Sequence, residues 1–81
     1  SGLPMLSARE EEILTLVSEG RTNFAIAEIL TISSFTVKNH VQRILRKLDA
    51  ANRAEAVAKY RQKNWSLRRK HIGNGTVVFA E

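Results

Sequence analysis

The feature that most limits the fold of this chain is an apolar stripe in residues 34–48 whose opposite side is cationic. Apolar side chains recur there at the spacing of one helix face, at Val37, Val41, Ile44, Leu45 and Leu48. The remaining positions include several lysines and arginines and no acidic residue before Asp49. Ser33 is suited to cap the start of such a helix. We therefore predict an amphipathic helix over residues 34–48 with a strongly basic exposed side.

A shorter apolar segment precedes this helix. The apolar residues of the segment fit a helix of about two turns and are Phe24, Ile26, Ala27, Ile29 and Leu30. Thr22 or Asn23 can cap it. Helix nucleation is costly at this length, so the segment must pack against its neighbours. With the tight connection at residues 31–33, the pattern predicts a helix-turn-helix.

Two further helices are predicted from capping signals. Ser7 and Glu10 form a Ser-x-x-Glu capping box, and Gly20 is suited to end the helix that follows, over residues 8–19. Asn52 and Glu55 form a second such signal, which opens a helix to about residue 63. Its small residues are Ala54, Ala56 and Ala58, which favour close packing against this core or against a second copy.

The helical pattern ends at Asn64. We expect a basic, flexible and irregular tail over residues 64–81, with Arg68–Lys70 as a cationic cluster and a short β-prone run before Phe79. Residues 1–5 are expected to be a lead-in, with Ser1–Gly2 interpreted as a tag remnant. Residues 6–63 form the predicted domain. The expected fold class is all-α, a four-helix helix-turn-helix bundle with an irregular C-terminal tail.

The charge distribution indicates a polyanionic partner. Residues 1–33 carry two cationic and five acidic side chains, whereas residues 34–81 carry eleven cationic and three acidic ones. A basic half on a small domain favours nucleic acid, with a solvated charged surface as the alternative. The second helix of a helix-turn-helix fits the major groove of DNA, where each base pair shows a distinct pattern of donors and acceptors.

Other classes of function lack the residues that they require. The chain has no cysteine and no apolar run long enough to span a membrane, so we expect a cytoplasmic protein without a membrane partner. Ser7 and Ser33 are interpreted as helix caps and His40 as a packing or hydrogen-bonding residue, because no catalytic or metal-binding partners accompany them. We expect no enzyme activity, cofactor, metal or small-molecule ligand.

The motifs together resemble the LuxR-type helix-turn-helix domain, also called the GerE type. The matching segments span about residues 6–60 and are Leu6–Glu10, Glu19–Gly20, Ile26–Ala27, Leu30, Ile32–Ser33, Thr36–Val41, Ile44–Leu45, Lys47–Leu48, Asn52–Arg53 and Glu55–Ala56. Members are usually C-terminal effector domains of quorum-sensing receptors or two-component response regulators. The resemblance implies four helices, promoter DNA as the partner, a homodimer through the fourth helix, and RNA polymerase as a further partner.

Position by position, the resemblance also implies a set of DNA-contacting residues. The base-contacting residues would be Lys38, Asn39 and Gln42. The phosphate-contacting residues would be Thr22, Asn23, Ser34, Thr36, Arg43, Arg46 and Lys47. The dimer interface would include Ala54, Ala58 and Arg61.

The chain departs from the family pattern at three positions. Phe24 and Ala25 stand where the family usually has a basic residue and a glutamate, and Phe35 replaces a usually polar residue. These changes remove an expected phosphate contact and place two aromatic rings near the expected DNA side. They motivate an alternative function, a protein–protein adaptor that kept the fold without DNA binding. A second alternative is a promoter reader like the fourth region of sigma factors, against which the Asn52–Ala56 motif argues.

Overall fold

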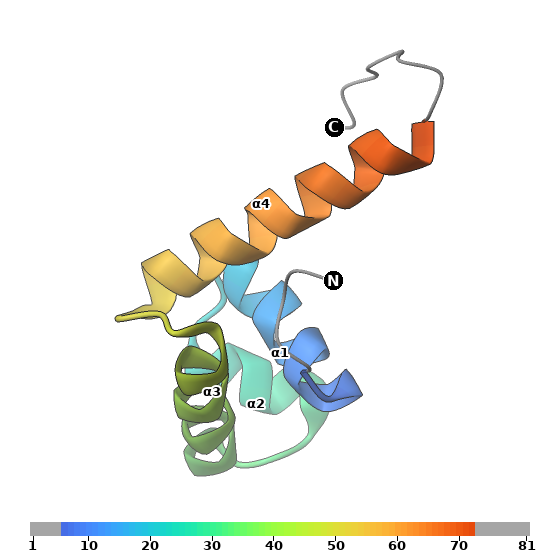
Figure 1. Ribbon diagram of the computed structural model, residues 1–81. Helices are drawn as coiled ribbons and strands as arrows, with labels where there is room; N and C mark the ends of the chain where they lie inside the picture. Colours follow the sequence, from blue (N-terminus) through green and yellow to red (C-terminus); the bar gives the residue numbers. More distant parts are fainter. Residues whose placement is uncertain (1–5, 73–81) are drawn as a thin grey trace.

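The computed structural model describes the backbone of residues 6–72 and the side chains of residues 6–63. It contains four helices in the order α1 (Ala8–Ser18), α2 (Asn23–Leu30), α3 (Ser34–Leu48) and α4 (Arg53–Ile72), and no strand within residues 6–72 (Figure 1). The predicted all-α helix-turn-helix fold is confirmed. The lead-in of residues 1–5 and the β-prone run after Ile72 lie outside the described residues.

Side-chain caps fix where the first three helices begin. Ser7 and Glu10 form the reciprocal capping box, in which the Ser7 Oγ accepts from the Glu10 amide at 3.1 Å and the Glu10 Oε1 accepts from the Ser7 amide at 2.9 Å. Thr22, not Asn23, caps α2 through the Ala25 amide. Ser33 caps α3 through the Thr36 amide, as predicted.

Left-handed backbone conformations end the same three helices. Gly20 follows α1 with φ of 85°, a conformation that costs glycine little. Thr31 after α2 and Asp49 after α3 adopt φ of 59° and 53° although both carry a Cβ atom. For the β-branched Thr31 this conformation stores strain. The three reversals keep the connections short, and short connections hold α2 against α3.

One hydrophobic core joins the four helices. The buried apolar side chains come from the four helices and from Leu6, which precedes α1. They are Leu6, Ile13, Leu14, Val17, Ile26, Ala27, Val37, Val41, Ile44, Leu48 and Ala56. Helix α3 packs against the other three helices. Because its apolar stripe faces the core, the rotation of α3 about its axis is set and its polar side must face outward.

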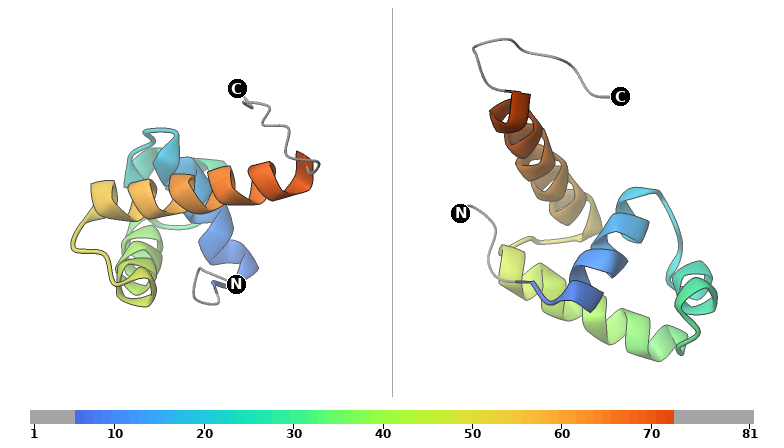
Figure 2. Two further views of the ribbon diagram at one scale, coloured as in Figure 1. Left: turned by 45° about the horizontal axis from the view of Figure 1, so that its top comes forward. Right: turned by 90° about the vertical axis from the view of Figure 1, so that its right-hand side faces the viewer.

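Helix α4 is longer than the sequence pattern suggested. It was expected to end near Lys63 but continues to Ile72, so the prediction of an irregular segment from residue 64 is wrong for residues 64–72. The chain has no glycine or proline between Gly20 and Gly73, and several of the residues in this segment favour helix. In Figures 1 and 2 the first half of α4 crosses the body formed by α1 to α3, and its last turns extend beyond that body.

Candidate nucleic-acid interface

The outward side of α3 carries the three residues predicted to contact bases. Lys38, Asn39 and Gln42 are all exposed, because the neighbouring residues Val37 and Val41 take the buried positions of α3. Arg43 and Arg46 are also exposed on this helix. Among residues 6–63, no carboxylate pairs with Lys38, Arg43 or Arg46, so their charges are available to an anionic partner.

An open hollow of about 540 Å³ lies beside this side of α3. Lys38 and Gln42 line it from α3, Asn23 from the start of α2, and Ala54 from the start of α4. The structure thus brings two predicted base-contacting residues together with one predicted phosphate-contacting residue and one predicted dimer residue. The four residues come from three helices, and only the packing of these helices brings Asn23 and Ala54 close to Lys38 and Gln42.

Three other predicted phosphate-contacting residues, Thr22, Ser34 and Thr36, lie at helix N-termini. Thr22 and Ser33 are caps, and the Thr36 hydroxyl lies 2.9 Å from the Ser33 hydroxyl. Ser34, the first residue of α3, is exposed. Helix N-termini present backbone N–H groups and the positive end of the dipole, which favour phosphate. Thr36 is only half-exposed, and its hydroxyl is held in the cap.

Lys47 has an intramolecular partner that the sequence did not reveal. Its Nζ lies 2.8 Å from Oε1 of Glu10, whose side chain is only 3% exposed. Burial raises the pKa of the Glu10 carboxyl, but hydrogen bonds from Lys47 and the Ser7 amide, with the Lys47 charge, outweigh burial and leave the pKa below its ordinary value. Glu10 is therefore more than a helix start, since it joins α1 to α3.

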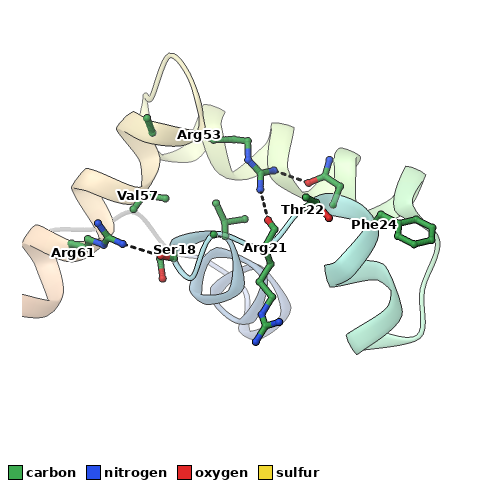
Figure 3. Close-up of a pocket in the computed structure, with 11 residues that line it drawn as sticks. Ser18, Arg21, Thr22, Phe24, Arg53, Val57 and Arg61 are labelled. Atoms are coloured by element: carbon green, nitrogen blue, oxygen red, sulfur yellow. Dashed lines mark hydrogen bonds between the residues drawn. The ribbon is translucent and has the colours of Figure 1, made fainter. Parts of the chain in front are cut away.

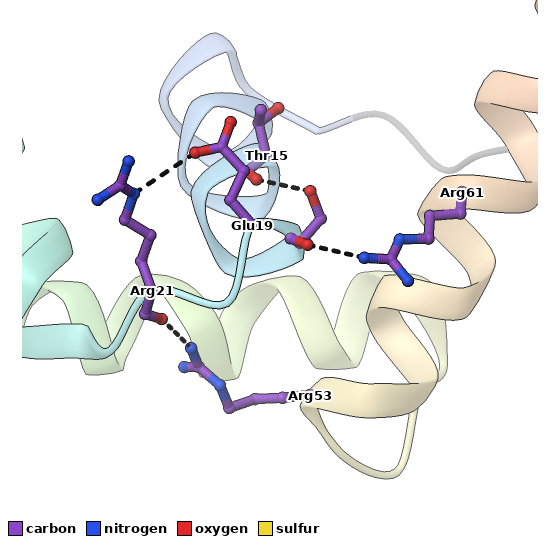
Figure 4. A network of polar contacts seen from close by, with 6 residues as sticks. Thr15, Glu19, Arg21, Arg53 and Arg61 are labelled. Atoms are coloured by element: carbon purple, nitrogen blue, oxygen red, sulfur yellow. Dashed lines mark hydrogen bonds and ion pairs between the residues drawn. The ribbon is translucent and has the colours of Figure 1, made fainter. Parts of the chain in front are cut away.

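Three cations of α4 bind backbone carbonyls, two of them at helix C-termini and one in the connection from α1 to α2. The Lys59 Nζ donates to the Leu48 and Asp49 carbonyls at 2.8 and 3.0 Å, at the end of α3. Arg61 donates to the carbonyl of Ser18, the last residue of α1, at 2.9 Å (Figure 4). Arg53 donates to the Arg21 carbonyl at 2.9 Å. Cations at helix C-termini are favoured by the dipole, so part of the basic half of the chain serves the fold.

A second open hollow, of about 800 Å³, lies between α4 and the connection from α1 to α2. Figure 3 shows Arg53 and Arg61 pointing from α4 toward this connection, with Phe24 at the opposite end from Arg61. The Arg53 Nη1 lies 2.6 Å from the Asn23 Oδ1. This bond ties the start of α2 to the start of α4, and no local sequence pattern could have indicated it, because the two residues lie thirty positions apart.

The predicted dimer residues share the outer side of α4. Ala54, Ala58 and Arg61 are exposed and follow one another at helical spacing. Ala56, which the sequence grouped with them, is instead buried in the core. Arg61 also holds the end of α1, so its guanidinium has an intramolecular acceptor.

Three large apolar side chains are exposed at the helix-turn-helix. Phe24 and Phe35 are 67% and 69% exposed, and Ile29 is 48% exposed. The two aromatic rings are the departures from the family pattern found in the sequence. Ile29 was assigned there to the apolar positions of α2, but it lies largely outside the core.

The described residues show no metal-binding group and no membrane-spanning helix. His40 is half-buried, and its buried Nδ1 has no hydrogen-bond partner among residues 6–63. No group of three or more His, Cys, Asp or Glu side chains comes together within the described part of the chain. None of the helices up to Ile72 is long and apolar enough to cross a bilayer.

A helix-turn-helix whose second helix presents an unpaired basic side defines a DNA-binding class of protein. Residues 4–60 match the family described as "Bacterial regulatory proteins, luxR family". The chain belongs to this family, which confirms the resemblance drawn from its motifs. Membership supports sequence-specific DNA binding in transcription regulation, and it favours this family over the sigma-factor alternative.

The relatives are transcription regulators by name. The chain is 43% identical over 60 residues to the transcriptional regulatory protein DesR of Bacillus subtilis and 49% identical over 59 residues to LiaR of the same organism, covering 74% and 73% of this chain. A crystal structure of the response regulator ChrA, of a heme-sensing two-component system, superimposes with a TM-score of 0.71 at 43% identity over 74% of this chain. The chain spans 30%, 28% and 30% of these three proteins, respectively.

Proposed function

We propose that this chain binds double-stranded promoter DNA sequence-specifically and thereby regulates transcription, with α3 in the major groove. The observation that carries the proposal is the exposed side of α3, where Lys38, Asn39 and Gln42 stand outward because the opposite side is buried. Lysine can donate to guanine O6 and N7, and Asn or Gln can pair with adenine through two hydrogen bonds. Reading of DNA bases therefore follows from side chains that the fold leaves in solvent.

Phosphate contacts would position α3 on the duplex. The N-terminus of α2 at Thr22 and Asn23, and that of α3 at Ser34 and Thr36, supply backbone N–H groups, while Arg43 and Arg46 supply charge. The Lys47 ammonium is already paired with Glu10, so its phosphate contact would have to compete with a buried carboxylate. We therefore assign Lys47 to the stability of the fold first.

Pairing of two copies through α4 would let the protein read two half-sites. Ala54 and Ala58 leave room for a second helix, and Arg61 lies on the same exposed side. Two linked modest contacts bind much more tightly than one. The relatives are about two and a half times as long as this chain, which supports a further domain that controls pairing. A role in transcription regulation supports the cytoplasm as the site of action and RNA polymerase as a further partner.

The proposal is tested by fluorescence anisotropy on duplexes selected by the chain from a randomised pool. We expect Lys38→Ala and Gln42→Ala each to reduce the preference for the selected duplex over random duplexes by about tenfold, the loss of a good base contact. Gln62→Ala is the matched control for Gln42→Ala, because Gln62 is an exposed glutamine on α4. Failure of the folded chain to select any duplex at low salt would refute DNA reading and favour the adaptor function.

A further inference from the structure

Phe35 lies on the same side of α3 as the proposed base-contacting residues. Residues 35, 38, 39 and 42 follow the i, i+3, i+4, i+7 spacing of one helix face. Phe35 is the second residue of α3, one turn before Lys38. In a helix-turn-helix it is the N-terminal part of the second helix that reaches the base edges. The ring therefore stands where the first base contact of α3 is expected.

The fold leaves this ring in water but holds its backbone firmly. Phe35 is 69% exposed, whereas Val37 two residues later is fully buried. The Ser33 hydroxyl accepts from the Thr36 amide at 3.0 Å and fixes the first turn. Phenylalanine has only two side-chain torsions, so little entropy is lost when the ring meets a partner. The ring contributes little to the core and is rigid enough to recognise a surface.

The chemistry of the ring selects one group in the major groove. A phenyl ring has neither charge nor a hydrogen-bond donor for phosphate. The apolar group that base pairs present in the major groove is the 5-methyl group of thymine, and phenylalanine is one of the side chains that contact it. We propose that Phe35 reads a thymine in each half-site through that methyl group. This inference rests on the proposed function, because it requires α3 to lie in the major groove.

Deoxyuridine supplies the test, because it removes only the methyl group from thymine. The probes are duplexes selected from a randomised pool by the wild-type chain, with each thymine replaced in turn by deoxyuridine. At one thymine per half-site we expect the wild-type dissociation constant to rise about fourfold, which corresponds to ~0.8 kcal/mol for one buried carbon group. The dissociation constant of Phe35→Ala should be the same on both probes.

Phe24→Ala is the matched control. Phe24 is 67% exposed, about as much as Phe35, but it lies on α2 and not on the base-contacting side of α3. This variant should keep the fourfold difference between thymine and deoxyuridine. A wild-type chain that binds every deoxyuridine probe as tightly as the thymine probe, or a Phe35→Ala variant that keeps the fourfold difference, would overturn the proposal and leave DNA binding intact. A folded chain that selects no duplex would overturn the proposed function itself, and this inference with it.

Discussion

Replacement of Lys47 by methionine should destabilise the fold while leaving base reading unchanged. The substitution keeps an unbranched side chain about as long as the apolar stem of lysine but removes the ammonium that donates to Glu10 at 2.8 Å. The Glu10 carboxylate, 3% exposed, then keeps hydrogen bonding only from Ser7, whose amide donates to Oε1 at 2.9 Å. An uncompensated buried charge is a large penalty, because water can no longer solvate it.

The expected loss in the free energy of unfolding is about 2 kcal/mol. Removing one partner of a fully buried pair costs about 3–5 kcal/mol, but the Lys47 side chain is 37% exposed, so solvent already screens part of the interaction. For a domain of this size, 2 kcal/mol corresponds to a fall in Tm of roughly 8–16 °C. Guanidinium denaturation followed by circular dichroism measures the loss.

The loss should also depend on pH, and its sign follows from Glu10. In the wild type the pKa of Glu10 lies below its ordinary value of 4.5, so the stability that it contributes is present above that value and lost as pH falls through the lowered pKa. Without Lys47, only the hydrogen bonding from Ser7 opposes burial, which raises the pKa of Glu10. The folded variant then tolerates protonation better, and the difference from the wild type should shrink as pH falls from about 7 toward 4.

A double variant separates the charge from the packing. Glu10→Gln with Lys47→Met removes both charges, so the double variant should be more stable at neutral pH than Lys47→Met alone. A Lys47→Met loss below about 0.5 kcal/mol, the level of ordinary surface substitutions, would refute the reasoning. A loss that is the same at all pH values would refute it equally.

Three further substitutions test the backbone and the packing of α4. Gly20→Ala should lower the free energy of unfolding by about 1–2 kcal/mol in thermal or chemical denaturation. The cause is the φ of 85° alone, because no atom lies within 4 Å of the added Cβ, and an unchanged free energy of unfolding would contradict this backbone conformation. Thr31→Gly should raise the free energy of unfolding by about 1 kcal/mol by relieving the left-handed strain, and a loss would show that no strain is stored there. Tyr60→Phe removes the 2.8 Å hydrogen bond to Thr15 and should lower the free energy of unfolding by about 1 kcal/mol in the same assay. An unchanged unfolding midpoint would show that this bond does not stabilise the fold.

The local features of the fold could be predicted because each depends on a few neighbouring residues. The caps at Ser7 and Ser33 and the bounds of α3 follow from hydrogen bonds and periodicity within one or two turns. The end of α4 could not be placed in the same way. Loss of a clear apolar stripe after Lys63 was interpreted as loss of helix, yet a polar helix needs no such stripe while no breaker interrupts it.

The candidate interface shows the same division. Exposure of Lys38, Asn39 and Gln42 follows from the stripe on the opposite side of α3, so the sequence was sufficient for these positions. The pairing of Glu10 with Lys47 joins residues thirty-seven positions apart, and the bond from Arg61 to the Ser18 carbonyl joins residues forty-three apart. Such contacts depend on how the helices cross. The sequence alone assigned Lys47 to DNA phosphate and Arg61 to a dimer interface, whereas both make bonds within the protein.

The bonds from α4 to the ends of α1 and α3 decide where the cooperative folding unit stops. Lys59 donates hydrogen bonds to the carbonyls at the end of α3, and Arg61 donates one to the last carbonyl of α1. A helix-turn-helix cut off before α4 would leave those carbonyls to water and would lose the buried Ala56 as well. The smallest fragment that unfolds as a single unit therefore extends past Arg61, so α4 is a part of the domain and not an attachment to it.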